Sequence, residues 1–348
     1  MTNPARVELA PGYSIARVIN GCWQLSPDHG GGPESGKTVL RRFAELVDHG
    51  FTTFDCADIY TGTEELLGKF RRTLASPDTI QIHTKFVPNK RSLADLDDRK
   101  IDASIDRSLR NIGVERLDLV QFHWWDYAVA GLHRIYERLL HAQSIGKIRL
   151  LGVTNFNTDK LQDLLDVNTS IVSMQAQYSL LDRRPERRMT ECCAQRDVAL
   201  LPYGVLAGGF LSDKYLGRQA SNSGNRSLQK YRLIIDDAGG WDVLQRLLAV
   251  LADIARKHGT GIDVIAARWV LDRPAVAAII LGIGNRSRAK ENLALGRIQL
   301  HEVDRDRIAE RLKSQTMPQG DPYDLERDAS TIHSKIIRTN LQDTGIAQ

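Results

Sequence analysis

The chain contains 348 residues, of which 42% are hydrophobic and 26% are charged. This is enough apolar sequence for a large buried core, and α/β barrels of this size commonly form one domain. The formal net charge of +4 comes without long Lys/Arg runs, which argues against a nucleic-acid partner.

The cysteines and the amino terminus indicate the compartment. Cys22, Cys56, Cys192 and Cys193 lack the spacing of a disulfide framework. The first residues do not combine a charged segment with an apolar core, as a signal peptide would. No run of about eighteen apolar residues, the length of a membrane helix, occurs. We therefore expect a reduced cytoplasmic protein without a membrane span.

The predicted elements begin with a β-hairpin over residues 7–18, turning at Pro11 and Gly12. Eight apolar runs rich in Val, Ile, Leu and Thr follow, as parallel strands buried on both faces require. They cover residues 18–25, 51–57, 80–86, 117–123, 148–156, 171–178, 198–206 and 277–284. Amphipathic segments separate them, most clearly at 38–48 and at 241–258, where Gly259 is a stop signal. This alternation predicts an α/β fold, a (β/α)8 TIM barrel forming one domain over residues 1–314.

Two segments break the alternation. Residues 212–240 are long, polar and rich in Gly, Ser and Asn, and they follow the seventh strand. A loop of this length in a compact fold is usually a lid or a binding loop. Residues 315–348 form a tail without clear periodicity, for which partial disorder is one interpretation.

Four chemically complementary residues lie at or just past the carboxyl ends of successive strands, where TIM barrels carry their chemistry. They are Asp55, Tyr60, Lys85 and His123. A tyrosine ordinarily titrates near pH 10, and a nearby ammonium lowers that pKa. We expect Tyr60 to protonate a carbonyl oxygen, Lys85 to make it more acidic, Asp55 to hold Lys85, and His123 to orient the substrate. Each residue alone has an ordinary structural explanation, but the set favours catalysis.

This arrangement resembles the catalytic tetrad of the aldo-keto reductase superfamily. In that family an Asp and a Tyr lie in D-x-A-x-x-Y, a Lys ends the next strand, and a His ends the one after. The resemblance runs from about Val7 to about Asn292. It implies an NAD(P)(H)-dependent oxidoreductase that interconverts an alcohol and a carbonyl compound, namely an aldehyde, a ketone or a sugar. It also implies that the tail folds across the mouth of the pocket.

A hydride carrier is required because none of the four side chains can donate hydride. The segment G-V-T-N-F resembles the family's G-V-S-N-F, which implies that Thr154 and Asn155 bind the nicotinamide carboxamide, with Gln175 as a third partner. Tyr203 matches the aromatic residue that stacks on the nicotinamide ring. Tyr203 is followed by a turn of mostly small residues, and four of them are expected to let the backbone approach a pyrophosphate closely. They are Gly204, Leu206, Gly208 and Gly209.

The segment at residues 282–294 resembles the family's adenosine-binding segment. Glu291 and Asn292 match the adenine-binding pair, and Arg288 can contact a 2′-phosphate. Gly284 stands where a cationic residue is common, although Arg286 can substitute for it. We therefore favour NADPH and leave NADH open.

Aromatic residues at the strand ends suit an apolar or sugar-like substrate. Trp23 and Trp124 are the candidates for substrate binding, with Trp125 as the alternative if the turn points differently. A metal-dependent barrel hydrolase is disfavoured because no H-x-H occurs, and we expect no metal. A non-catalytic sensor or partner subunit that binds the nucleotide is the alternative function. The sequence leaves the substrate and the oligomeric state open.

Overall fold

Eight parallel strands form the centre of the computed structural model, which describes residues 4–26, 36–167, 170–220 and 225–337. The strand order is β10-β3-β4-β5-β6-β7-β8-β9. The strands are β3 (Val18–Gly21), β4 (Thr53–Asp55), β5 (Gln81–Phe86), β6 (Leu117–Phe122), β7 (Ile148–Thr154), β8 (Ile171–Gln175), β9 (Ala199–Leu200) and β10 (Ile279–Gly282). The two outer strands also meet, because the Ile280 amide donates to the Pro202 carbonyl at 2.8 Å. The predicted (β/α)8 barrel is confirmed.

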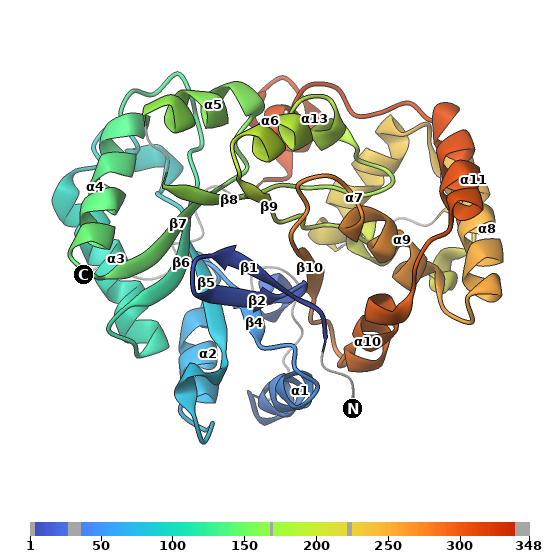
Figure 1. Cartoon of the computed structure of the whole chain (residues 1–348). Helices are drawn as coiled ribbons and strands as arrows, with labels where there is room; N and C mark the ends of the chain where they lie inside the picture. The colour runs from blue at the N-terminus through green and yellow to red at the C-terminus, as the bar shows by residue number, and fades with distance from the viewer. Residues whose placement is uncertain (1–3, 27–35, 168–169, 221–224, 338–348) are drawn as a thin grey trace.

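Helices surround the sheet and alternate with its strands along the chain (Figure 1). They are α1 (Gly36–Asp48), α2 (Thr63–Arg71), α3 (Asp98–Ile112), α4 (Leu132–Ser144), α5 (Thr158–Val167), α6 (Met189–Gln195), α7 (Arg226–Asp237), α8 (Trp241–Lys257), α9 (Ile262–Leu271), α10 (Ala289–Arg297), α11 (Glu302–Lys313), α12 (Asp324–Arg327) and α13 (Ile332–Lys335). In the part of the chain that the structure describes, no helix combines the length and apolar character that a membrane crossing requires.

Local sequence explains where the expected helices begin and end. The Asp97 side chain caps α3 by accepting from the Lys100 amide at 2.8 Å, and Gly113 ends that helix in the left-handed conformation. Helix α8 buries Leu244, Leu247 and five other side chains along one face. Its amphipathic pattern therefore directs that face toward the barrel.

The amino-terminal hairpin closes one end of the barrel. Strands β1 (Arg6–Ala10) and β2 (Tyr13–Ala16) pair antiparallel, with Ala10 opposite Tyr13 as the predicted turn requires. Ile15 packs with buried side chains of the barrel strands in a separate small core. The Tyr13 hydroxyl also lies 3.2 Å from Nε2 of His83 on β5. The opposite end, where the strands finish, is left open for a site.

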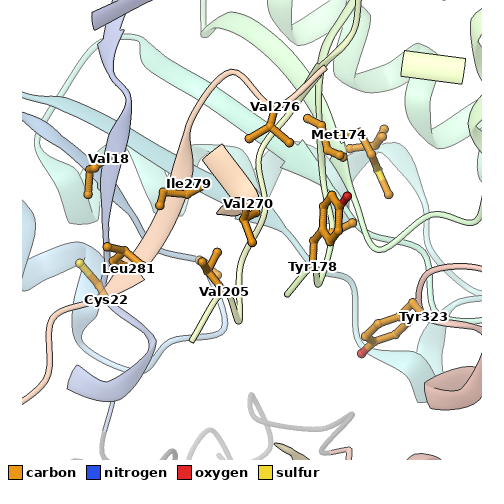
Figure 2. Packing of buried hydrophobic residues seen from close by; sticks show 14 of the residues in the cluster. Val18, Cys22, Met174, Tyr178, Val205, Val270, Val276, Ile279, Leu281 and Tyr323 are labelled. Carbon is orange, nitrogen blue, oxygen red and sulfur yellow. The ribbon is translucent and has the colours of Figure 1, made fainter. Parts of the chain in front are cut away.

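The main core lies between the barrel and its helices. Figure 2 shows Val18 on β3 beside Ile279 and Leu281 on β10, with Cys22 just beyond the end of β3. These strands are direct neighbours, so branched side chains from both pack into the same layer. The core is apolar, and its close packing fixes the positions of the strand ends.

The segment 212–240 is more ordered than predicted. It contains a short 3-10 helix, Asp213–Tyr215, and the twelve-residue helix α7, while residues 221–224 lie outside the described part of the chain. The Asn225 side chain caps α7 by accepting from the Ser227 amide at 2.9 Å. Ile234 and Ile235 are its buried side chains, and the polar Gly-, Ser- and Asn-rich residues that precede it explain why a loop was expected here.

The described part of the tail, residues 315–337, is folded and includes α12 and α13. Glu326 of α12 is fully buried and pairs with Arg184 of the barrel. Arg327 donates to the Trp124 carbonyl at 2.8 Å. The tail therefore packs against the carboxyl ends of the strands. Residues 338–348 lie outside the described part, and the division into a domain over 1–314 and a tail stays a prediction.

Candidate active site

A cavity of about 1020 Å³ opens at the carboxyl ends of the barrel strands. Fifteen of the predicted site residues line it. They are Trp23, Asp55, Tyr60, Lys85, His123, Thr154, Asn155, Gln175, Tyr203, Gly204, Leu206, Gly208, Gly209, Arg288 and Glu291. Trp124 and Asn292 do not line the cavity; both are buried elsewhere.

Asp55 and Lys85 form a buried ion pair at one side of the cavity. Asp55 is the last residue of β4, and Lys85 lies near the end of the neighbouring strand β5. Nζ of Lys85 donates to Oδ1 and Oδ2 of Asp55 at 2.8 and 2.7 Å, and to the Cys56 carbonyl at 2.7 Å. Asp55 Oδ1 also accepts from Nε2 of Gln175 at 2.7 Å. These bonds compensate for burial of both charges.

Tyr60 lies beside this pair. Nζ of Lys85 is 5.3 Å from the centre of the Tyr60 ring, and the Trp23 ring meets the same ring edge-on at 5.2 Å. Burial raises the pKa of Tyr60 well above its usual value, and the Asp55 carboxylate adds to that rise. The net pKa of Tyr60 is therefore raised in the protein alone and not lowered as expected, and the phenol keeps its proton at neutral pH. The contribution of Lys85 stays a prediction.

His123 follows β6 and presents one ring nitrogen without a partner. Its Nδ1 lies 3.2 Å from the Thr154 carbonyl, and because a carbonyl only accepts, Nδ1 carries the proton. Burial, with a smaller contribution from Arg327, lowers the pKa of His123 to about 3. The ring is therefore neutral, and Nε2 is buried without a hydrogen-bond partner among the described residues. That atom can accept a hydrogen bond from a hydroxyl group.

Two aromatic residues surround His123, and one of them was not predicted. The Trp125 ring stands perpendicular to the imidazole at 4.3 Å, and its indole N–H donates to the Pro88 carbonyl at 2.7 Å. Tyr323 of the tail stands edge-on to the other side at 5.5 Å. The tail sequence lacks periodicity, so only the Tyr in its G-D-P-Y-D segment offered a signal.

Trp124 is not a pocket residue, and its predicted role in substrate binding is wrong. Its side chain has no exposed surface and packs against Phe122 at 6.0 Å between ring centres. The chain bends just past β6, and Trp125, unlike Trp124, lines the cavity. The alternative, Trp125, lies at the cavity, and its role in substrate binding stays a prediction.

The ends of β7, β8 and β9 bring polar groups to the next part of the cavity. Asn155 has a left-handed backbone, with φ of 61°, and its Oδ1 accepts from the Tyr203 hydroxyl at 2.8 Å. Gln175 donates a hydrogen bond from Nε2 to Asp55, and the Oε1 atom of Gln175 can accept one. The amide nitrogen of Asn155 and the carbonyl oxygen of Gln175 are complementary to a carboxamide.

Helix α7 covers the glycine-rich turn that follows β9. A side chain on Gly204 would approach the Tyr231 hydroxyl to 2.6 Å, and one on Gly208 would approach Cδ2 of the same ring to 2.5 Å. Both glycines also have φ of 67°, which disfavours other residues. Nζ of Lys230 lies 5.1 Å from the centre of the Tyr203 ring. Lys230 and Tyr231 were not predicted as site residues, because α7 was not recognised.

The predicted adenosine end contains two ion pairs. Arg288 donates from Nη2 to Oδ2 of Asp263 at 2.6 Å, and Nη1 of Arg286 lies 2.6 Å from Oε1 of Glu291. Both arginines expected at a 2′-phosphate therefore have carboxylate partners. A side chain at Gly284 would meet nothing within 4 Å, so the position has room for a larger residue.

Potential metal ligands are dispersed through the part of the chain that the structure describes. No three His, Cys, Asp or Glu side chains there lie close enough together to hold a metal ion. The four cysteines are all unpaired and buried.

Comparisons with known proteins agree with this geometry. The family model described as "Aldo/keto reductase family" matches residues 17–313. The chain is 25% identical over 286 residues to the aldo-keto reductase YhdN of Bacillus subtilis, covering 78% of this chain and 82% of the relative. It is 28% identical over 297 residues to flagellar radial spoke protein 5 of Chlamydomonas reinhardtii, covering 67% of this chain but only 56% of that protein.

A solved structure shares the fold. The glycerol dehydrogenase from Gluconobacter oxydans is similar with a TM-score of 0.74 at 22% identity, covering 89% of this chain and 95% of that one. The family model extends over most of the barrel. The chain therefore belongs to the aldo/keto reductase family, whose members are oxidoreductases that act on small carbonyl compounds with nicotinamide cofactors.

Proposed function

We propose that this protein interconverts a carbonyl compound and its alcohol, with Tyr60 as general acid and base and NADP(H) as cofactor. The observation that carries the proposal is the cluster at one side of the cavity. A protonated Tyr60 lies beside a buried Asp55–Lys85 pair, and the same cavity is lined by His123, whose Nε2 has no hydrogen-bond partner among the described residues.

The proton chemistry follows from these side chains. When bound, the reduced cofactor supplies the hydride, which leaves negative charge on the former carbonyl oxygen. Tyr60 donates its phenolic proton to that oxygen, and in the reverse direction the phenolate removes the proton from the alcohol. Lys85 supplies positive charge near the phenolate when the proton has left, and Asp55 holds the ammonium in place.

His123 positions the oxygen. Because its Nδ1 proton is held by the Thr154 carbonyl, Nε2 accepts rather than donates. Nε2 of His123 therefore contacts the hydroxyl of the alcohol, and of His123 and Tyr60 only Tyr60 donates a proton to the substrate oxygen. This role differs from that of an imidazolium, which would compete with Tyr60 as acid.

The chemistry of the remaining strand ends fits a dinucleotide. Asn155 and Gln175 complement a carboxamide, with Thr154 as a hydroxyl beside them, and Tyr203 offers a ring for stacking. The turn containing Gly204 can bring backbone N–H groups to a pyrophosphate. Leu206, Gly208 and Gly209 belong to this turn, and Lys230 adds positive charge to the same wall.

A weak preference for NADPH follows from the adenosine end. Arg288 and Arg286 can contact a 2′-phosphate, with Glu291 at the adenine and Asn292 behind it as a buried support. Both arginines are paired with carboxylates, and Gly284 supplies no cation. NADH therefore remains an acceptable cofactor.

The substrate wall is aromatic. Trp23, Trp125 and Tyr323 line the cavity near Tyr60 and His123. Aromatic faces pack on apolar groups and on the C–H faces of sugars. We propose an aldehyde, ketone or sugar carbonyl of small size as the substrate.

The proposal is tested by mixing the purified protein with NADPH or NADH and a panel of aldehydes, ketones and aldoses. Carbonyl-dependent loss of reduced-cofactor absorbance, with formation of the matching alcohol, is the expected result. Tight binding of the dinucleotide without turnover on any carbonyl would instead support the non-catalytic sensor or partner subunit.

A further inference from the structure

Two carboxylates occupy the amino terminus of helix α9, which faces the adenosine end of the cavity. Oδ2 of Asp213 accepts from the Ile262 amide at 3.0 Å, and Oδ1 of Asp263 accepts from the Val264 amide at 3.0 Å. Both side chains line the cavity. The first amides of a helix attract anions, but here two of them, at Ile262 and Val264, already have carboxylate partners. These carboxylates place negative charge where a phosphate would otherwise be attracted.

The second oxygen of Asp263 engages Arg288. The two side chains are largely buried, with 11% and 17% of their surfaces exposed, and their ion pair measures 2.6 Å. Nε of Arg288 is buried without a hydrogen-bond partner among the described residues. The guanidinium is thus held by one carboxylate oxygen and retains a donor that the protein leaves unused.

We infer that Asp263 determines the choice between NADPH and NADH, an inference that rests on the proposed function. A 2′-phosphate drawn to Arg288 must approach the Asp263 carboxylate, so the two anions repel each other and compete for the same guanidinium. The 2′-hydroxyl of NADH can instead donate to Asp263, as it does to the acidic residue of other dinucleotide sites. Asp263 therefore weakens NADPH binding and supports NADH binding.

The neighbouring ion pair does not have the same effect. Arg286 is 64% exposed, so its contact with Glu291 is screened by solvent and is readily exchanged for a phosphate contact. The buried Arg288–Asp263 pair is the one that a ligand must disrupt. This difference in burial singles out Asp263.

The test compares Asp263→Asn with wild type by calorimetric titration of NADPH and NADH. Asn is isosteric and keeps Oδ1 as the acceptor for the Val264 amide, so the start of α9 is preserved. The Kd for NADPH should fall about tenfold or more, since a charge-assisted contact to Arg288 is released. The Kd for NADH should stay the same or rise. Asp263→Ser, which also keeps a capping oxygen without charge, provides a second variant if Asn disturbs the fold.

Two controls separate this effect from a general change of charge. Asp253→Asn removes one surface carboxylate that pairs with Arg256 and Arg307 on the outer helices, and it should leave both Kd values unchanged. Arg288→Ala added to Asp263→Asn should abolish the gain in NADPH affinity. Adenosine 2′,5′-bisphosphate and AMP, titrated in parallel, should show the same ratio change as the full cofactors.

The outcomes distinguish the two levels of the proposal. If wild type binds both dinucleotides but the ratio of the two Kd values changes less than about threefold in both Asp263 variants, Asp263 does not determine the choice and the proposed function stands. If wild type binds neither dinucleotide, the proposed function and this inference both fail. A rise in NADPH affinity that persists without Arg288 would also overturn the inference, because the contact would lie elsewhere.

Discussion

The phenol ring of Tyr323 stands edge-on to the imidazole of His123, with 5.5 Å between the ring centres, although 200 residues separate the two along the chain. Arg184 and Glu326 fix this contact. Nη1 of Arg184 lies 3.0 Å from Oε2 of Glu326, both side chains are fully buried, and Asp182 holds the other side of the guanidinium. One wall of the cavity therefore depends on an ion pair between the tail and the barrel.

Glu326→Gln should loosen the tail. The substitution keeps the shape but removes a buried charge, and breaking a buried pair typically costs about 3–5 kcal/mol of unfolding free energy. Asp182 still compensates Arg184, so the loss should lie near the lower value. Hydrogen exchange over residues 321–337 should accelerate. Glu310→Gln, which disrupts an exposed pair with Lys313, is the control and should change stability by less than about 1 kcal/mol. Equal effects of the two variants would contradict the proposed anchoring.

Removing Lys85 should affect stability and activity in different ways. Lys85→Met leaves Asp55 as a buried carboxylate without its cation, at a cost of about 3–5 kcal/mol. Adding Asp55→Asn should restore much of the unfolding free energy, while turnover stays severely reduced in both variants. Denaturant unfolding and initial rates measure the two properties. If the double variant regained turnover along with stability, Lys85 would have only a structural role.

Two buried histidines make stability fall in acid. Burial lowers the pKa of both His83 and His123 to about 3, whereas an unfolded histidine titrates near 6.5. Below pH 6.5 the unfolded state therefore binds protons that the folded state does not. The two neutral histidines therefore contribute fully to the free energy of unfolding above about pH 6.5, and this contribution is lost progressively toward pH 3. Between these values the free energy of unfolding changes by about 1.4 kcal/mol per pH unit for each residue.

Single variants isolate this dependence. His83→Gln and His123→Gln should each reduce the slope of unfolding free energy against pH between pH 4 and 6. The expected reduction is about 1.4 kcal/mol per pH unit, which corresponds to one proton. Burial raises the pKa of Asp58 to about 8, so this carboxyl makes the free energy of unfolding fall as the pH rises, opposite to the histidines. The slope of each variant is therefore compared with that of wild type. Only His123→Gln should change turnover, because His83 does not line the cavity. Unchanged slopes would mean that these rings are charged in the folded protein.

Helix α7 should respond to the cofactor. Lys230 and Tyr231 cover the ring of Tyr203 and the turn at Gly204, where the nicotinamide and pyrophosphate are proposed to bind. We expect hydrogen exchange over residues 226–237 to slow at saturating NADPH. Exchange in α3, on the outside of the barrel, should not change. Identical protection of α7 with and without the cofactor would show that this helix is not part of the binding site.

The barrel and most of the cavity lining could be predicted because they depend on regular local patterns. Apolar strands alternate with amphipathic helices, and in a parallel barrel all strand ends meet at one rim, which places Asp55, Lys85 and His123 together. The contributions of α7 and the tail could not be predicted. Tyr231 acts through packing on Gly204, and Tyr323 through an ion pair at Glu326, contacts between segments far apart in sequence. The direction of the Tyr60 pKa was missed because it depends on burial, which sequence does not give.

The central claim is that Tyr60 transfers the proton. Tyr60→Phe removes only the hydroxyl and keeps the ring that contacts Trp23. Its steady-state turnover, measured on the best carbonyl substrate together with the Kd of the reduced cofactor, is the most direct test. We predict that turnover falls about 10²–10⁴-fold, the usual contribution of a positioned proton donor, while the Kd changes little. Turnover within a few-fold of wild type would contradict the account, because another group would then supply the proton.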